Sequence, residues 1–228
     1  MTGLIERIGR ALVIAPHPDD EVLGCGGVLA RLADAGKATH VAIVTEGRAP
    51  QYTAAHAATL GKETRAAQAL LGITDVHYIG LPAAALDQVA HAAVNSLIAE
   101  LVTSVAPDTL FVPFGGDVHL DHQLVFASAM VAARPNRETY PVRILAYETM
   151  SETNWNAPGI SPAFVPNVFI DISTTLDRKL AAMAAYKSQV RPLPSERSIE
   201  ALAALARVRG STVYRSAAEA FMLIREVG

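Results

Sequence analysis

The residues best suited to chemistry lie near the start of the chain, in segment 17–21, which reads His-Pro-Asp-Asp-Glu. This segment holds one imidazole and three carboxylates, and it closely follows the apolar run 11–14. Because like charges raise one another's pKa, clustered acids are costly unless a positive group lies among them. A divalent cation is the simplest such group, and histidine with aspartate suits zinc. The alternative is structural: Asp19 or Asp20 caps a helix, and His17 is a polar strand end.

A second polar cluster lies in segment 117–122, which reads Asp-Val-His-Leu-Asp-His and closely follows the apolar run 109–112. Two parallel strands whose carboxyl ends both carry histidine and aspartate can converge on one metal ion. His119 and His122 are three residues apart, so on a helical turn they share a face. We expect one of them to bind the metal and the other to contact the substrate. The alternative is a pair of surface histidines near a Gly-Gly turn.

These clusters require elements that deliver them to one edge of a sheet. Apolar runs of strand length alternate with segments of helical length, which predicts an α/β fold: a Rossmann-like, doubly wound, mostly parallel sheet flanked by helices. The length of 228 residues fits one domain, 1–228. Strands are expected at 11–15, 40–44, 76–79, 109–112, 143–147 and 168–172, and helices at 20–36, 56–71, 89–105, 124–133, 176–186 and 195–208.

The composition narrows the class of protein. Hydrophobic residues make up 51% of the chain and the formal net charge is −3, so nothing favours binding to nucleic acid or to an anionic membrane. No apolar run approaches the ~20 residues of a membrane span, and the first ten residues lack the apolar core of a signal peptide. Cys25 is the single cysteine, which fits a reducing compartment and a buried apolar side chain better than a metal ligand. We expect a cytoplasmic protein.

The two clusters and several later segments carry a resemblance to a known family. Segments 17–21 and 119–122 resemble motifs of the LmbE-like, or PIG-L, family of zinc-dependent N-acetylglucosaminyl de-N-acetylases. The resemblance implies an LmbE-like fold and a deacetylase that removes the N-acetyl group of an N-acetylglucosamine-type sugar conjugate, releasing acetate and a free amine. It extends over nearly the whole chain, through Tyr147-Glu148, Pro166-Asn167, Tyr186-Lys187-Ser188-Gln189, Arg197-Ser198, Arg209-Gly210 and Ala218-Glu219-Ala220-Phe221.

The resemblance also implies roles for individual residues. Asp19 matches the family's general base, and His119 matches the group that faces the tetrahedral oxyanion or protonates the leaving amine. Asp121 lies between the two histidines of its segment and is placed to orient an imidazole, as carboxylates beside metal ligands do. The implied ion is Zn2+, although Fe2+ or Mn2+ suits the same ligands. The positions that match the zinc ligands are His17, Asp20 and His122.

Several residues are candidates for substrate contact. Family members often carry an acid just after the Leu-Pro pair at 81–82, associated with binding sugar hydroxyls, but alanines occupy 83–85 here and Asp87 is the candidate replacement. The family's His-Pro before the Arg-Ser pair is also absent, with Ser195-Glu196 in its place. Arg48 is a candidate for binding substrate oxygens, or else a solvated loop charge. The complete set is Arg48, Asp87, Asp117 and Arg197.

Other functions share these features. A metal–water site also serves hydrolases of other small amides or of phosphoesters, and a non-catalytic, metal-containing metabolite-binding protein is a further alternative. We interpret His40, His56, His77 and His91 as surface or packing residues, because they lie outside any ligand-like cluster. The loop 150–166 is interpreted as a lid over the crevice, as a contact in a homo-oligomer, or as packing.

Overall fold

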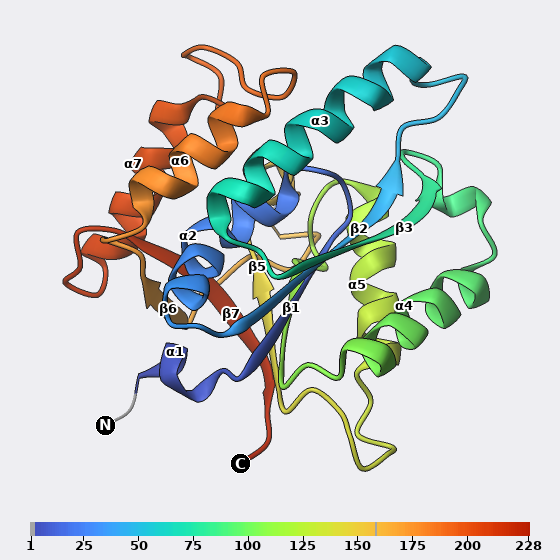
Figure 1. Cartoon of the computed structure of the whole chain (residues 1–228), viewed down its shortest axis with the longest axis horizontal. Coiled ribbons are helices and arrows are strands. Elements are labelled where there is room, and N and C mark those ends of the chain that lie inside the picture. Colours follow the sequence, from blue (N-terminus) through green and yellow to red (C-terminus); the bar gives the residue numbers. More distant parts are fainter. Residues whose placement is uncertain (1–2, 158) are drawn as a thin grey trace.

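A computed structural model of the protein describes residues 3–157 and 159–228, and a seven-stranded sheet runs through it (Figure 1). The strands are β1 (Arg10–Ala15), β2 (Ala38–Glu46), β3 (Asp75–Pro82), β4 (Thr109–Pro113), β5 (Arg143–Tyr147), β6 (Val168–Asp171) and β7 (Ala218–Glu226). Their order across the sheet is β3-β2-β1-β4-β5-β7-β6. Strands β1 to β5 pair in parallel, whereas β7 is antiparallel to both β5 and β6. The predicted α/β fold with a mostly parallel sheet is confirmed.

Helices cover both faces of this sheet. They are α1 (Leu4–Arg7), α2 (Asp20–Asp34), α3 (Ala54–Leu71), α4 (His91–Val105), α5 (Leu120–Ala132), α6 (Leu176–Ala185) and α7 (Ile199–Ser211), with the short 3-10 helices η1 (Leu86–Gln88) and η2 (Thr153–Trp155). Helices α2, α3, α6 and α7 lie on one face, and α4 and α5 lie on the other (Figure 1). Among the described residues, no helix combines the length and apolar character needed to cross a membrane.

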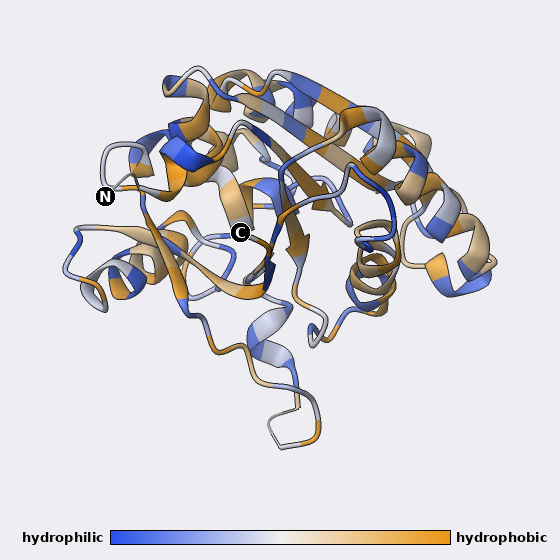
Figure 2. Ribbon diagram, turned by 90° about the horizontal axis from the view of Figure 1, so that it is seen from below, coloured by the Kyte–Doolittle hydropathy of each residue, from blue (hydrophilic) through white to orange (hydrophobic). Residues whose placement is uncertain are grey.

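The sheet separates two hydrophobic cores. Successive side chains of a strand point to opposite faces, so Val13 of β1 packs with α2 while Leu12 and Ile14 pack with α4 and α5. Strands β4 and β5 are buried along their whole length, which is why they read as continuous apolar runs in the sequence. Figure 2 shows hydrophobic residues gathered on the strands and on the inner sides of the helices.

The strand order creates one favoured place for a ligand. From β1 the chain builds outward through β2 to β3, and it then returns to place β4 on the other side of β1. The carboxyl ends of β1 and β4 therefore flank the point where the winding direction reverses, where open α/β sheets form their ligand crevices. Both polar clusters of the sequence follow these two strands.

Two elements differ from the expected ones in ways that bear on the site. Helix α5 begins at Leu120 rather than at 124, because the His119 side chain caps it by accepting a hydrogen bond from the backbone N–H of Asp121. His122 consequently lies in the first turn of a helix. The terminal segment forms β7, for which the sequence pattern predicted no strand; it contains a buried acid, Glu219.

Candidate active site

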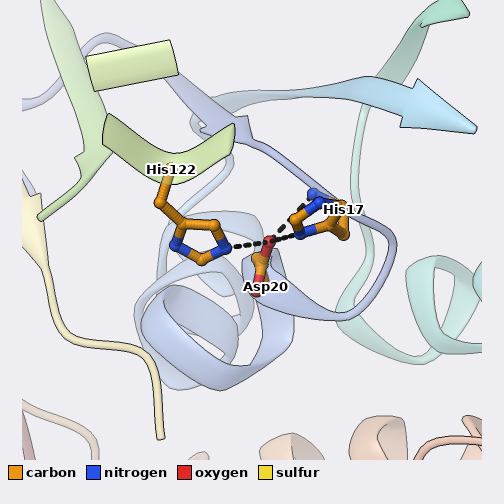
Figure 3. A group of neighbouring side chains, drawn as sticks. All are labelled: His17, Asp20 and His122. Carbon is orange, nitrogen blue, oxygen red and sulfur yellow. Dashed lines mark hydrogen bonds and ion pairs between the residues drawn. The ribbon is translucent and has the colours of Figure 1, made fainter. Parts of the chain in front are cut away.

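Three side chains from two distant segments converge at the carboxyl ends of β1 and β4 (Figure 3). His17 Nδ1 lies 3.3 Å from Asp20 Oδ2, and His122 Nε2 lies 3.2 Å from the same oxygen. Ligands bound tetrahedrally at about 2.0–2.2 Å from a metal ion lie about 3.3–3.6 Å from one another. The three side chains are therefore spaced as ligands of a single ion.

The local backbone aims these side chains at one point. Asp20 opens α2, and its carboxylate accepts a hydrogen bond of 2.8 Å from the backbone N–H of His17, which fixes the turn after β1. The backbone N–H of His122 donates to the carbonyl of His119 at 3.1 Å, in the first turn of α5. The side chains of Asp20 and His122 are buried, whereas that of His17 is 20% exposed. The site is accordingly open to solvent on the side of His17.

A further carboxylate holds each imidazole from behind. Asp117 Oδ2 lies 2.8 Å from His122 Nδ1, and Asp121 Oδ2 lies 3.0 Å from His17 Nε2. Such carboxylates fix the ring orientation and make the other ring nitrogen a better ligand. We expected Asp117 to contact the substrate. Its side chain is instead entirely buried against His122 and Thr153.

The charges around this point favour a cation. Burial acts to lower the pKa of His17, but hydrogen bonds to Asp121 and Asp20 outweigh it and raise the pKa to about 9. For His122, Asp20 and Asp117 outweigh burial and raise the pKa to about 10. His122 Nε2 is nevertheless buried with no hydrogen-bond partner among the described residues. A buried nitrogen that lies 3.2 Å from a carboxylate oxygen without the geometry of a hydrogen bond fits a metal ligand, so these residues suit a divalent cation.

Asp19 is not one of the three ligand-spaced residues, and it presents a separate carboxylate. Its backbone is left-handed, with φ 105°, a conformation that a non-glycine residue keeps only when its surroundings hold it. The guanidinium of Arg197 donates a hydrogen bond to its side chain. Burial raises the pKa of Asp19 well above its usual range, against the opposing effect of Arg197. A carboxylate with a raised pKa can accept a proton near neutral pH.

Glu21, for which residue spacing indicated no separate role, holds the backbone of Asp19. Its Oε2 accepts a hydrogen bond of 3.0 Å from the N–H of Asp19, and its Oε1 accepts one of 2.6 Å from the hydroxyl of Tyr186. Glu21 and Tyr186 are both entirely buried. The presence of both residues in the segments that resemble the family was the available signal, but their contact joins positions too far apart to be read from spacing.

His119 faces the same region with a defined proton position. Its Nδ1 accepts a hydrogen bond of 3.1 Å from the backbone N–H of Asp121, so the neutral ring carries its proton on Nε2. Burial, with a smaller contribution from His17, lowers the pKa of His119. The ring centroids of His119 and His17 are 4.6 Å apart. His119 therefore offers a neutral N–H donor beside the three ligand-spaced side chains.

His17, Asp19, Asp20 and His119 line a cleft of about 180 Å³. Its lining also includes Tyr52, His56 and Leu60, which lie at intervals of four residues in and before α3, and Glu152 from the loop after β5. Our interpretation of His56 as a surface or packing residue overlooked this position, and the interval of four was the signal that could have found it. The complete lining is His17, Pro18, Asp19, Asp20, Gly47, Tyr52, His56, Leu60, Ala83, His119, Glu152, Gln189 and Arg197.

Two of the expected substrate-binding residues are not brought to the cleft. Arg48 turns back to its own strand end, where Nε donates to Glu46 Oε1 at 2.7 Å and Nη2 donates to the carbonyl of Gly80 at 2.5 Å. Asp87 is exposed in η1 and bonds to the side chain of Gln88. Neither residue lines the cleft. Arg197 does line it, but its guanidinium is engaged with Asp19 and with Ser151 Oγ.

A further histidine group lies near the amino ends of β2 and β3. His40 Nδ1 and His77 Nε2 are 3.3 Å apart, and Asp75 Oδ2 lies 3.7 Å from the same nitrogen of His77. The interpretation of these two histidines as lying outside any ligand-like cluster was therefore wrong. Cys25, in contrast, is buried in the core as expected and belongs to none of the groups with ligand spacing among the described residues.

Comparison with known proteins identifies the family to which the chain belongs. The family model described as PIG-L, GlcNAc-PI de-N-acetylase, matches residues 12–133. The uncharacterized deacetylase YaiS of Escherichia coli (strain K12) is 30% identical, over 78% of this chain and 90% of that protein. The 2'-N-acetylparomamine deacetylase of Streptomyces fradiae is 27% identical, over 80% of this chain and 74% of that protein.

A solved structure has a similar fold. The conserved protein TT1542 from Thermus thermophilus has a TM-score of 0.78 to this protein at 29% identity, over 96% of each chain. The family match spans both polar clusters and more than half of the chain. This protein therefore belongs to the PIG-L, or LmbE-like, family of GlcNAc-PI de-N-acetylases.

Proposed function

We propose that this protein is a metal-dependent deacetylase that hydrolyses the acetamide of an N-acetylglucosamine-type sugar conjugate, releasing acetate and a free amine. One observation carries the proposal. Two imidazoles and a carboxylate are spaced around a single point, with a separate buried carboxylate, Asp19, and a neutral N–H donor, His119, lining the same cleft. These are the groups that metal-assisted amide hydrolysis requires.

The proposed ion is zinc, held by His17, Asp20 and His122. When bound, zinc supplies Lewis-acid polarisation of the acetamide carbonyl and lowers the pKa of water to about 7. Asp117 and Asp121 keep the two imidazoles oriented toward the ion. The same three ligands suit iron or manganese, so the identity of the ion is a separate matter for metal analysis.

The protein's own groups then move the protons. Asp19 takes a proton from the attacking water as the new carbon–oxygen bond forms, and Arg197 keeps the Asp19 carboxylate in place. His119 donates its Nε2–H to the acetamide oxygen as negative charge develops there. When the carbon–nitrogen bond breaks, the nitrogen accepts a proton, for which protonated Asp19 is the source within the cleft. Acetate and the amine are the products.

The relatives support the direction of this proposal, because two of those described above are named as deacetylases. A panel of acetamido glycosides and nitrophenyl phosphates, supplied to enzyme loaded with zinc, tests it. We expect acetate to appear in step with free amine, without release of nitrophenol. Nitrophenol release without acetate would favour phosphoester hydrolysis, and metal binding with neither product would favour a non-catalytic protein.

A further inference from the structure

Glu152 presents a carboxylate to the cleft without a partner. It lines the same cavity as His17 and Asp19, and its side chain makes no hydrogen bond or ion pair with any residue that the structure describes. Its backbone, in contrast, is fixed: its N–H donates to the carbonyl of Thr149 at 3.1 Å, and its carbonyl accepts from the N–H of Val118 at 3.2 Å. A held backbone with a free carboxylate is an arrangement that can receive a donor from a ligand.

Glu152 is partly buried, so its carboxyl has lost part of its hydration, and this burial raises its pKa. A partly buried acid without a hydrogen-bond donor is a cost to the folded protein. That cost is relieved when a ligand brings a positive charge or an N–H group to the carboxylate, because hydrogen bonds between charged groups are stronger than those between neutral ones.

Apart from the groups of the proposed metal site, the cleft offers Glu152 no free cation among the described residues. Within the described part of the chain, Arg197 is the only arginine or lysine in the lining. Its Nη1 and Nη2 donate to Ser151 and Asp19, and its Nε has no partner but is buried away from the cleft solvent. Arg48 lies near the rim beside Gly47, but it is engaged with Glu46 and Gly80. Apart from the groups of the proposed metal site, a phosphate or carboxylate on the substrate would therefore meet Glu152 without finding a free arginine or lysine in the described lining.

Another part of the lining is formed by two stacked aromatic rings and a leucine. The rings of Tyr52 and His56 stack with their centroids 5.5 Å apart and their planes at 21°, and Leu60 continues the same row. The face of such a ring can pack against the C–H groups of a sugar or of a short aliphatic chain. This wall gives a substrate contact area without adding charge.

From these observations we infer that the cleft selects acetamido sugars whose aglycone, the group attached to the sugar, carries a protonated amine in addition to the acetamide nitrogen. Glu152 binds this amine, and the rest of the attached group packs along Tyr52 and His56. The inference rests on the proposed deacetylase function, since it assigns a substrate class to the same site. It makes Glu152 a residue for specificity and leaves proton transfer to Asp19 and His119.

Three N-acetylglucosaminides with attached groups of similar size test this inference: propyl (neutral), 3-aminopropyl (cationic) and 2-carboxyethyl (anionic). For wild-type enzyme, we expect kcat/KM for acetate release to be at least about tenfold higher for the amine than for the propyl glycoside, a ratio that one charge-assisted hydrogen bond supplies. We expect the carboxylate to be the poorest substrate. In Glu152→Gln the ratio of amine to propyl should fall to within about twofold of unity.

A matched control variant removes the same charge elsewhere. Glu100→Gln changes an exposed carboxylate on α4, outside the cleft, and should keep the wild-type ratio. The same glycosides are also titrated by calorimetry into Asp19→Asn, so that binding is measured without turnover. The expected order of affinity is again amine, then propyl, then carboxylate.

The outcomes separate this inference from the proposed function. Acetate release with equal kcat/KM for the three glycosides, or with a ratio that Glu152→Gln leaves unchanged, would overturn the inference while the deacetylase proposal stands. Binding in the expected order without acetate release by the wild-type enzyme would overturn the deacetylase proposal, while the preference for a cationic attached group would stand. Absence of any preference in both assays would overturn the inference as well.

Discussion

Groups of histidine and aspartate lie at both ends of the parallel strands, which we call the carboxyl edge and the amino edge of the sheet. The two groups contain the same residue types but differ in burial and in the partners of their imidazoles. At the carboxyl edge lie His17, Asp20 and His122. At the amino edge lies a group formed by His40, Asp75 and His77. In the first, the side chains of His122 and Asp20 are 0% and 3% exposed; in the second, those of His77 and Asp75 are 26% and 59% exposed.

The surroundings of the imidazoles differ as well. His17 and His122 each have a carboxylate behind them, and His122 Nε2 has no hydrogen bond. The two histidines of the amino edge instead bond to one another, with ring planes at 19°, and burial with the nearby charge of His77 lowers the pKa of His40. Ligand identity alone therefore does not define the site. Burial, supporting carboxylates and position at the reversal of strand order are what distinguish the carboxyl edge.

The largest effect is expected from removing a proposed metal ligand at the carboxyl edge. Asp20→Asn takes away the one oxygen that lies near both imidazoles, so we expect loss of bound zinc and a fall in acetate release of more than about 10⁴-fold. Asp75→Asn, the same change at the amino edge, should alter neither. Metal analysis and initial rates check both variants, with circular dichroism as the control for folding. Equal effects of the two changes would erase the distinction between the edges.

The next largest effect is expected at Asp19, the proposed general base. Asp19→Asn keeps the ligands intact, so zinc content should remain while kcat falls by about 10²–10⁴-fold, the usual contribution of general acid–base catalysis. Turnover is measured on the best acetamido glycoside with a zinc-loaded enzyme. Unaltered kcat at normal zinc content would remove Asp19 from this role.

A somewhat smaller loss is expected at His119. His119→Ala removes the N–H donor, and loss of one oxyanion-hole donor typically costs ~2.7–4 kcal/mol in the transition state, or about 10²–10³-fold in kcat. Zinc content should be retained, because this histidine is not one of the three ligands. If the variant lost its zinc, His119 would have to be counted as a ligand; near-normal activity would exclude it as a donor.

The supporting carboxylates should have the smallest effect on the carboxyl edge. Asp117→Asn leaves His122 in place but removes the charge behind it, and we expect zinc affinity to weaken by about 10–100-fold. Competition with a chelator of known affinity measures this change, and activity should return at high zinc concentration. An unchanged affinity would show that burial alone orients His122.

The sequence was informative wherever the needed residues are neighbours in the chain. The apolar runs indicated the parallel strands, and the clusters at 17–21 and 117–122 contain His17, Asp20 and His122, because each cluster follows a strand end. Long side chains were harder to predict. Arg48 sits at the right strand end, yet it bonds to Glu46 and Gly80, a local choice that spacing does not encode.

Other features depend on contacts between distant segments. Glu152 lies in the loop after β5 and Tyr52 precedes α3, so only the folded chain brings them to one cleft. Strand β7 contains Glu219, a charge that is unusual in a buried strand and is balanced by Lys179 at 2.5 Å. A pattern based on apolar periodicity cannot foresee such a partner, because the partner belongs to another element.

The most direct measurement is the zinc content per chain of three proteins purified and loaded in parallel: wild type, His122→Ala and the double variant His40→Ala/His77→Ala. We predict one tightly held ion in the wild type and in the double variant, and none in His122→Ala, with acetate release following the ion. Retention of the full zinc content by His122→Ala, or its loss in the double variant alone, would contradict the assignment of the metal site to the carboxyl edge of the sheet.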